Sequence, residues 1–220
     1  MCMENMEIVT INGKKHLHFT NQFFIFSMYP KWYHSNQPKG KKEKRKMDIY
    51  FLSKNPQEVA SSLADEHITE MLTNTTKILC SAFRRSEGDK RADERKLPNS
   101  SCPWYSVTSW AIETKANFIW LWTLGFSLAT EFQTRFHSIH PDTEVLKRIE
   151  IPELLTGHLM SPFPQTFPDK YRTEDIIISN RIFYCTEKLC TPEWTERERP
   201  EWIDSYEICY NEYSEYDENN

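Results

Sequence analysis

Five side chains that could move protons or bind phosphate follow one another along a predicted helix: His67, Glu70, Asn74, Lys77 and Arg84. Their spacings of three, four, three and seven residues place them on one face of an α-helix. An imidazole beside a carboxylate can act in general acid–base catalysis, and the two cations can pair with phosphates. Such a stripe is also typical of a solvated helix face, so the pattern alone does not establish a site.

Other kinds of site find no support in the sequence. Neither Cys185 with Cys190 nor His137 with His140 belongs to a group of four ligands with zinc spacing. The chain has 5 glycines and no glycine-rich phosphate-binding motif, and no Gly-x-Ser-x-Gly motif is present. The sequence therefore predicts no metal and no cofactor.

Charge is distributed unevenly along the chain. The net charge is −5, but residues 1–46 carry +6, residues 47–200 carry −4 and residues 201–220 carry −7. We expect residues 1–46 to be a basic extension that is poorly ordered or lies upstream of a start at Met47, because no helical or strand period is sustained across it. A nucleic-acid arm and a localisation signal are the functional alternatives. The acidic, tyrosine-rich residues 201–220 are predicted to be a poorly ordered tail that could bind another protein.

The first predicted elements are a short apolar segment and a long helix. Residues 47–52 form either a strand or a buried lead-in. Asn55 followed by Pro56 predicts a helix start, and helical character continues to about residue 85 with a break near Asp65. Residues 84–103 resemble a loop, with mixed charge and two prolines.

A second long helix is predicted from about residue 108 to 138. Its middle, around Trp120 and Leu121, is apolar on almost every side, as in the centre of a bundle. A short helix capped by Asp142 or Thr143, an irregular connection over 151–168 and a helix over 173–189 complete residues 47–200. The predicted fold is mainly α: a compact helical bundle around a long central apolar helix.

The sequence also indicates a compartment. The longest apolar stretch, residues 118–129, is shorter than the roughly 20 residues that cross a bilayer, so no membrane association is expected. The N-terminus lacks a secretory leader pattern. Six cysteines without such a leader are typical of reduced thiols, and we predict a cytoplasmic protein.

Four motifs resemble a small uncharacterised family from phages and large DNA viruses. The first is Asp65-Glu66-His67-Ile68-Thr69-Glu70-Met71, where the family has Asp-Lys-His-x-x-Lys-Met. The others are Trp110-Ala111-x-Glu113-Thr114-x-x-Asn117-Phe118-x-Trp120-Leu121, Glu131-Phe132-x-x-Arg135-Phe136-x-x-x-His140 and Pro164-Gln165-x-Phe167-Pro168-Asp169-Lys170-Tyr171. Together they span about residues 47–200.

More loosely, residues 63–83 resemble the first helix of phage pyrimidine-dimer DNA glycosylases of the endonuclease V type. In that family an N-terminal amine attacks the sugar, and a catalytic Glu lies seven residues after the His, with an Arg three further on. This chain has Asn74 and Lys77 at those positions, and Glu70 stands where the viral family has Lys. The resemblance therefore implies a scaffold whose catalytic site is degenerate.

Two hypotheses follow. In the first, the chain is a viral DNA-repair or DNA-processing protein resembling a glycosylase/AP lyase. His67, Glu70 and Asn74 would then form the catalytic face, and double-stranded DNA would meet Lys77, Arg84, Arg85, Lys90 and Arg91. In the second, it is a non-enzymatic viral accessory protein that binds a viral or host protein. The negative charge of residues 47–200 and the missing Glu favour the second hypothesis, and the polar stripe and the resemblances favour the first.

Overall fold

The computed structural model describes residues 49–99, 105–189 and 192–206, together with the backbone of three strands within residues 6–24. The chain divides into two compact units, residues 1–46 and 47–220. This boundary falls directly before Met47, where the sequence analysis placed it. The sequence analysis expected residues 1–46 to be poorly ordered or upstream of a start at Met47; apart from the three strands, these residues lie outside the described part of the chain.

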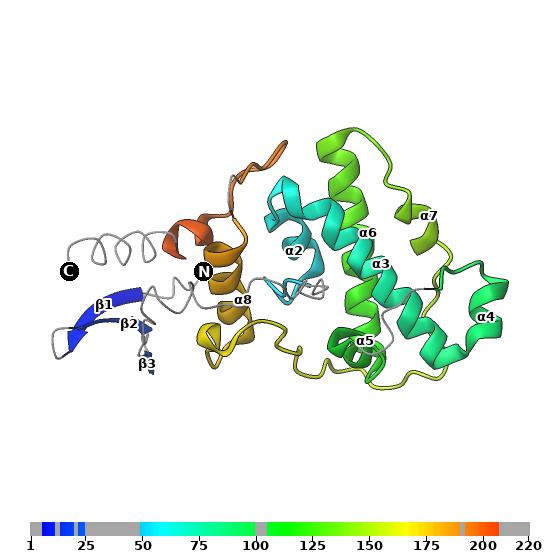
Figure 1. Cartoon of the computed structure of the whole chain (residues 1–220), viewed down its shortest axis with the longest axis horizontal. Coiled ribbons are helices and arrows are strands. Elements are labelled where there is room, and N and C mark those ends of the chain that lie inside the picture. Colours follow the sequence, from blue (N-terminus) through cyan, green and yellow to red (C-terminus); the bar gives the residue numbers. More distant parts are fainter. Residues whose placement is uncertain are drawn as a thin grey trace, which may run out of the picture. The chain divides into compact units, whose positions relative to one another are not determined.

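The N-terminal unit contains a three-stranded antiparallel sheet that the sequence analysis did not predict (Figure 1). Strands β1 (Met6–Ile11), β2 (Lys14–Phe19) and β3 (Gln22–Phe24) pair in chain order. Ile11 is opposite Lys14, and the two residues between them are Asn12 and Gly13. That dipeptide is typical of a two-residue hairpin and was the missed signal, because a period sought over 46 residues does not detect strands this short.

The predicted helix start at Asn55 is confirmed. The Asn55 side chain accepts a hydrogen bond from the Gln57 amide at 3.0 Å, and α2 runs over Pro56–Ser62. Helix α3 (Asp65–Glu87) follows after Leu63 and Ala64, so the break near Asp65 is also confirmed. Gly88 then adopts φ +86°, a conformation that suits glycine, and ends α3.

Two boundaries in the middle of the unit differ from the predictions. Residues 89–94, expected in a loop, form α4 (Asp89–Glu94), a short helix rich in charged side chains and therefore without an apolar stripe. The predicted helix over 108–138 is two helices, α5 (Ser106–Ala111) and α6 (Lys115–Phe136). Thr114 causes the break, because its side chain accepts a hydrogen bond from the Asn117 amide at 3.1 Å and caps α6.

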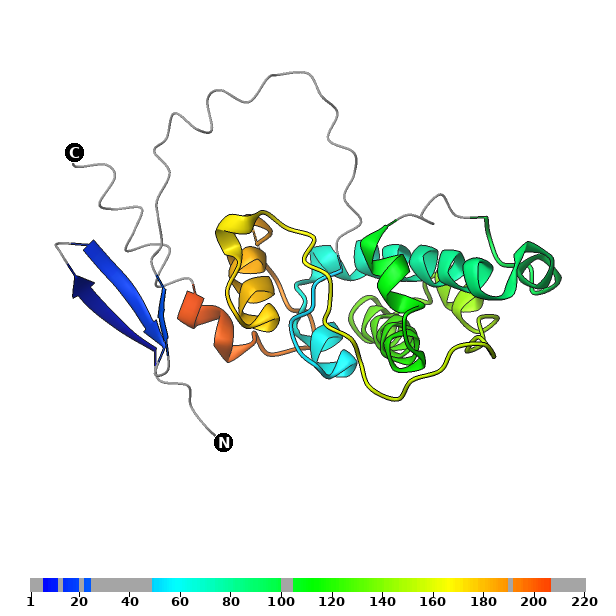
Figure 2. The same ribbon diagram turned by 90° about the horizontal axis from the view of Figure 1, so that it is seen from below.

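Helix α6 lies at the centre of the helical bundle, as predicted. Trp120 is 5% exposed, and Leu121, Leu124 and Leu128 are fully buried. Helices α2 and α3 pack against α6, and α4 and α8 lie at opposite ends of the bundle in both views (Figures 1 and 2). The fold of this unit is therefore mainly α, and the apolar segment at residues 49–52 is a buried lead-in.

The last elements are α7 (Asp142–Leu146), the 3₁₀ turn η1 (Asp169–Tyr171) and α8 (Ile176–Glu187). Helix α8 begins later than predicted because Asp175 caps it, accepting from the Ile177 amide at 2.7 Å. Residues 201–206 are helical and Ile203 is fully buried, so the predicted tail is part of the bundle at its start. Residues 207–220 lie outside the described part. Among the described helices, none is both long and apolar enough to cross a membrane.

Candidate functional site

The polar stripe on α3 is only partly accessible. His67 is 9% exposed and Asn74 is 8% exposed, whereas Glu70 and Lys77 are exposed to solvent. Ser81 is also buried. His67, Asn74 and Ser81, which are spaced by seven residues, thus pack inward. Glu70 and Lys77, which lie between them, face outward. Spacing alone could not show this difference, because burial depends on the segments that pack over the helix, as Tyr50 and Tyr184 do over His67.

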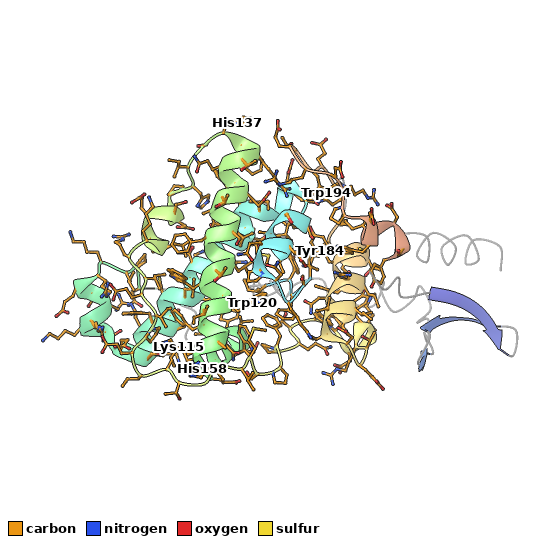
Figure 3. All side chains as sticks on the ribbon, turned by 180° about the vertical axis from the view of Figure 1, so that it is seen from behind. Lys115, Trp120, His137, His158, Tyr184 and Trp194 are labelled. Carbon is orange, nitrogen blue, oxygen red and sulfur yellow. The ribbon has the colours of Figure 1, made fainter. Side chains whose placement is uncertain are left out.

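His67 is held in place by Tyr184 of α8, which is labelled in Figure 3. The Tyr184 hydroxyl accepts a hydrogen bond from the Ala64 amide at 2.9 Å and lies 3.0 Å from Nδ1 of His67. Because the hydroxyl has one hydrogen to donate, the arrangement fits Nδ1 of His67 as the acceptor and places the imidazole proton on Nε2. The ring of Tyr50 meets the His67 ring edge-on, with 5.8 Å between the ring centroids.

Burial sets the electrostatics of this contact. It lowers the pKa of His67, and the nearby Lys188 acts in the same direction, whereas Glu66 and Glu70 oppose the shift. Burial also raises the pKa of Tyr184. His67 is therefore neutral at neutral pH and presents a hydrogen-bond donor at Nε2, while Tyr184 occupies its basic nitrogen.

Asn74 stands where the resemblance places a catalytic carboxylate. An amide does not exchange protons near neutral pH, and the buried position of Asn74 keeps its side chain from solvent. Glu70 is an exposed carboxylate one turn earlier on α3. This face of α3 therefore presents a neutral histidine and an amide, and the amide stands at the position where the resemblance expects a carboxylate.

Three of the predicted phosphate-binding cations are engaged within the protein. Arg84 donates to Asp89 at 3.1 Å and to Asp93 at 2.6 Å, which raises its pKa, and Arg91 pairs with Glu87 and Glu153.

Arg85 donates to the Ser109 hydroxyl at 3.0 Å. The other two predicted contacts, Lys77 and Lys90, are exposed. The carboxylates beside Arg84 and Arg91 cancel much of the positive charge at this corner of the bundle, so the five cations do not form the uniformly basic face that nucleic-acid binders usually present.

The sequence analysis missed a buried ionic network at the junction of α2 and α3. Glu131 and Arg135 of α6 form an ion pair, with 3.1 Å between Oε2 and Nε. Arg135 also donates to Asp65 at 3.0 Å and to the carbonyl oxygens of Ser61 and Leu63. Every nitrogen of this fully buried guanidinium therefore has a partner.

Residues 193–197 close the network from the other side. Arg197 donates to both carboxylate oxygens of Glu131, at 3.0 to 3.2 Å. The Thr195 hydroxyl donates to Asp65 at 2.7 Å, and Trp194 donates to the Ser62 carbonyl (Figure 3). Burial alone raises the pKa of Asp65, but the hydrogen bonds from Thr195 and Arg135 lower it overall. Asp65 and Arg135, which belong to two of the quoted motifs, thus join α3, α6 and the C-terminal segment.

A second group of motif residues also supports the fold. The amide of Asn117, in α6, donates to the Trp110 carbonyl and the Ser161 hydroxyl, both at 2.7 Å, and accepts from the Ser161 amide at 3.0 Å. Trp120 donates to the Lys54 carbonyl at 2.7 Å. These contacts fix the irregular segment around Ser161 and the residues before α2 against α6.

Comparisons with known proteins add no relative: no family model, no curated protein and no solved structure matches the chain. Within the described ranges, no group of three or more His, Cys, Asp or Glu side chains is arranged to hold a metal ion.

Proposed function

We propose that the chain is a degenerate relative of the DNA glycosylase/AP lyases of the endonuclease V type, which binds DNA and does not cleave it. The observation that carries this proposal is Asn74, a buried amide on α3 at the position where the resemblance places the catalytic Glu. Proton transfer during sugar opening requires a group that titrates, and an amide does not. A phage or large-DNA-virus origin and action in the host cytoplasm belong to the same proposal and rest on the resemblance.

A direct test is binding of the full chain to short duplexes that contain an abasic-site analogue, a thymine dimer or neither. We expect tighter binding to one of the damaged duplexes than to the undamaged duplex, with no strand cleavage. Changing the exposed Lys77 to Gln should weaken binding and reduce its dependence on salt by about one counterion. Lys147→Gln is the matched control, since Lys147 is an exposed lysine directly after α7. Equal affinity for all three duplexes would contradict the proposal.

A second candidate function is a non-enzymatic accessory protein that binds another protein. The specific observation in its favour is the pairing of Arg84 with Asp89 and Asp93, and of Arg91 with Glu87 and Glu153. Side-chain cations that neutralise DNA phosphates displace the counterions of the DNA. Arg84 and Arg91 are already paired with carboxylates of the protein. Binding should be measured at about 50 mM salt, where contacts with phosphates are strong. Absence of binding to every duplex under these conditions would favour this second function.

A further inference from the structure

The contact between α3 and α8 depends on one imidazole nitrogen that lies between two alternative partners. Nδ1 of His67 is 3.0 Å from the Tyr184 hydroxyl and 3.9 Å from a carboxylate oxygen of Glu66. The first partner is a fully buried hydroxyl on α8, and the second is a half-exposed carboxylate on the same turn of α3. We propose that His67 is a proton-operated switch: neutral His67 bonds Tyr184 and holds α8 on α3, and protonated His67 turns to Glu66 and loosens that contact.

The neutral state is defined by the hydrogen bonds of Tyr184. Its oxygen accepts from the Ala64 amide at 2.9 Å, and in the neutral state that we propose its hydrogen is donated to Nδ1 of His67, 3.0 Å away. Three segments are joined through this one hydroxyl: the residue before α3, the first turn of α3 and the middle of α8. A proton on Nδ1 removes the acceptor for the Tyr184 hydrogen, and a buried hydroxyl left without an acceptor costs about 1–3 kcal/mol.

The groups that face His67 determine which state is favoured. On α3 these are Glu66 and Glu70, which favour the protonated state. At the end of α8, Lys188 disfavours it, and the low exposure of His67 disfavours it further. The rings of Tyr184 and Tyr50 lie against the imidazole, with 5.2 and 5.8 Å between the ring centroids.

The direction of the pH effect follows from the lowered pKa of His67. In the unfolded chain His67 takes up a proton near its ordinary pKa of 6.5, while the folded protein still excludes it. The stabilising contribution is therefore complete above pH 6.5 and is lost as the pH falls through the lowered pKa. Because the Tyr184 hydroxyl and ring lie against the His67 imidazole, opening this contact would expose His67, the first residue of the polar stripe, so the inference concerns regulation of access to that residue.

The Ala64 amide is a direct reporter of the switch, because its hydrogen bond ends on the Tyr184 hydroxyl. We expect hydrogen-exchange protection of this amide in the full chain, corrected for the intrinsic rate, to fall as the pH is lowered from 7.5 to 5. One proton can change it by at most about tenfold per pH unit. The His67 imidazole, followed by NMR, should titrate over the same range. Protection that stays constant, or that changes over a different range from the imidazole, would overturn the switch.

Variants separate the switch from a general effect of acid. His67→Gln keeps an acceptor for Tyr184 and cannot titrate, so the pH dependence at Ala64 should disappear. Glu66→Gln removes the alternative partner and should move the transition to lower pH. His140→Gln is the matched control. Nδ1 of His140 likewise accepts a hydrogen bond, in this case from the backbone amide of Asp142 at 3.2 Å. The same pH dependence in His67→Gln and in the unchanged chain would refute the proposal. These measurements require no DNA, so their outcome is separable from that of the duplex-binding test.

Discussion

At the scale of single residues, burial determines what each polar side chain can do. Arg135 and Lys77 are both cations on long helices, but Arg135 is fully buried with all its nitrogens paired, and Lys77 is exposed. Arg135 therefore acts on the fold, whereas the side chain of Lys77 lies at the surface. Sequence spacing assigned both to polar positions and could not distinguish them, because burial depends on the segments that pack over each helix.

Removal of the Arg135 side chain tests this structural role. In Arg135→Met, the carboxylates of Asp65 and Glu131 and two carbonyl oxygens lose the hydrogen bonds that Arg135 donates to them. Breaking a buried ion pair in this way destabilises a protein by roughly 3–5 kcal/mol. Chemical denaturation of the full chain measures the loss. Lys147→Met, which removes an exposed lysine paired with Glu144, should change the free energy of unfolding by less than about 1 kcal/mol. Equal effects of the two variants would contradict the assigned role.

The candidate site could be predicted from sequence only in part. The helix that carries His67 could be predicted, because a helix start is a local feature of the sequence. The partner of His67, Tyr184, lies 117 residues further along the chain and no local pattern connects the two. Arg197 and Thr195 were missed for the same reason, since their contacts with Glu131 and Asp65 are also remote in sequence.

At the scale of elements, helix boundaries depend on capping side chains more than on apolar periodicity. The apolar pattern runs without interruption from α5 into α6, and the hydroxyl of Thr114 ends that continuity by capping α6. Asp175 likewise sets the start of α8. Helix α4 shows the converse, because a short exposed helix has no apolar stripe by which to detect it.

Thr114→Ala should therefore shorten or loosen the start of α6. Loss of a side-chain cap typically costs about 1 kcal/mol of stability. Hydrogen exchange at the Asn117 amide, which donates to Thr114, measures the local effect, and thermal unfolding measures the global one. Thr114→Ser retains the hydroxyl and should behave like the natural chain. If Thr114→Ala left protection of the Asn117 amide unchanged, Thr114 would not be the residue that separates α5 from α6.

At the scale of the whole molecule, the chain consists of two units whose boundary lies between residues 46 and 47. The lead-in at Ile49–Leu52 follows this boundary closely and is buried in the helical unit. Phe51 donates its amide to Asn180 of α8 at 3.1 Å, so the start of the helical unit is fixed by the unit itself.

Deletion of residues 1–46 should consequently leave the helical unit folded. We expect circular dichroism of residues 47–220 to show a cooperative thermal transition within a few degrees of the transition of the same unit in the full chain. The sharp near-ultraviolet signal of packed aromatic side chains should also be retained. A shortened chain that aggregates or lacks this signal would mean that the N-terminal unit contributes to the core.

The most direct test of the proposed function is borohydride trapping of the full chain on a duplex with an abasic site. A lyase forms a Schiff base with the opened sugar, and borohydride reduces it to a stable covalent adduct. Because Asn74 replaces the catalytic carboxylate and His67 is engaged by Tyr184, the degenerate site predicts that little or no adduct is trapped and that the strand stays intact. Abundant adduct and strand cleavage that persist in Glu70→Gln, the variant without the neighbouring exposed carboxylate, would contradict it.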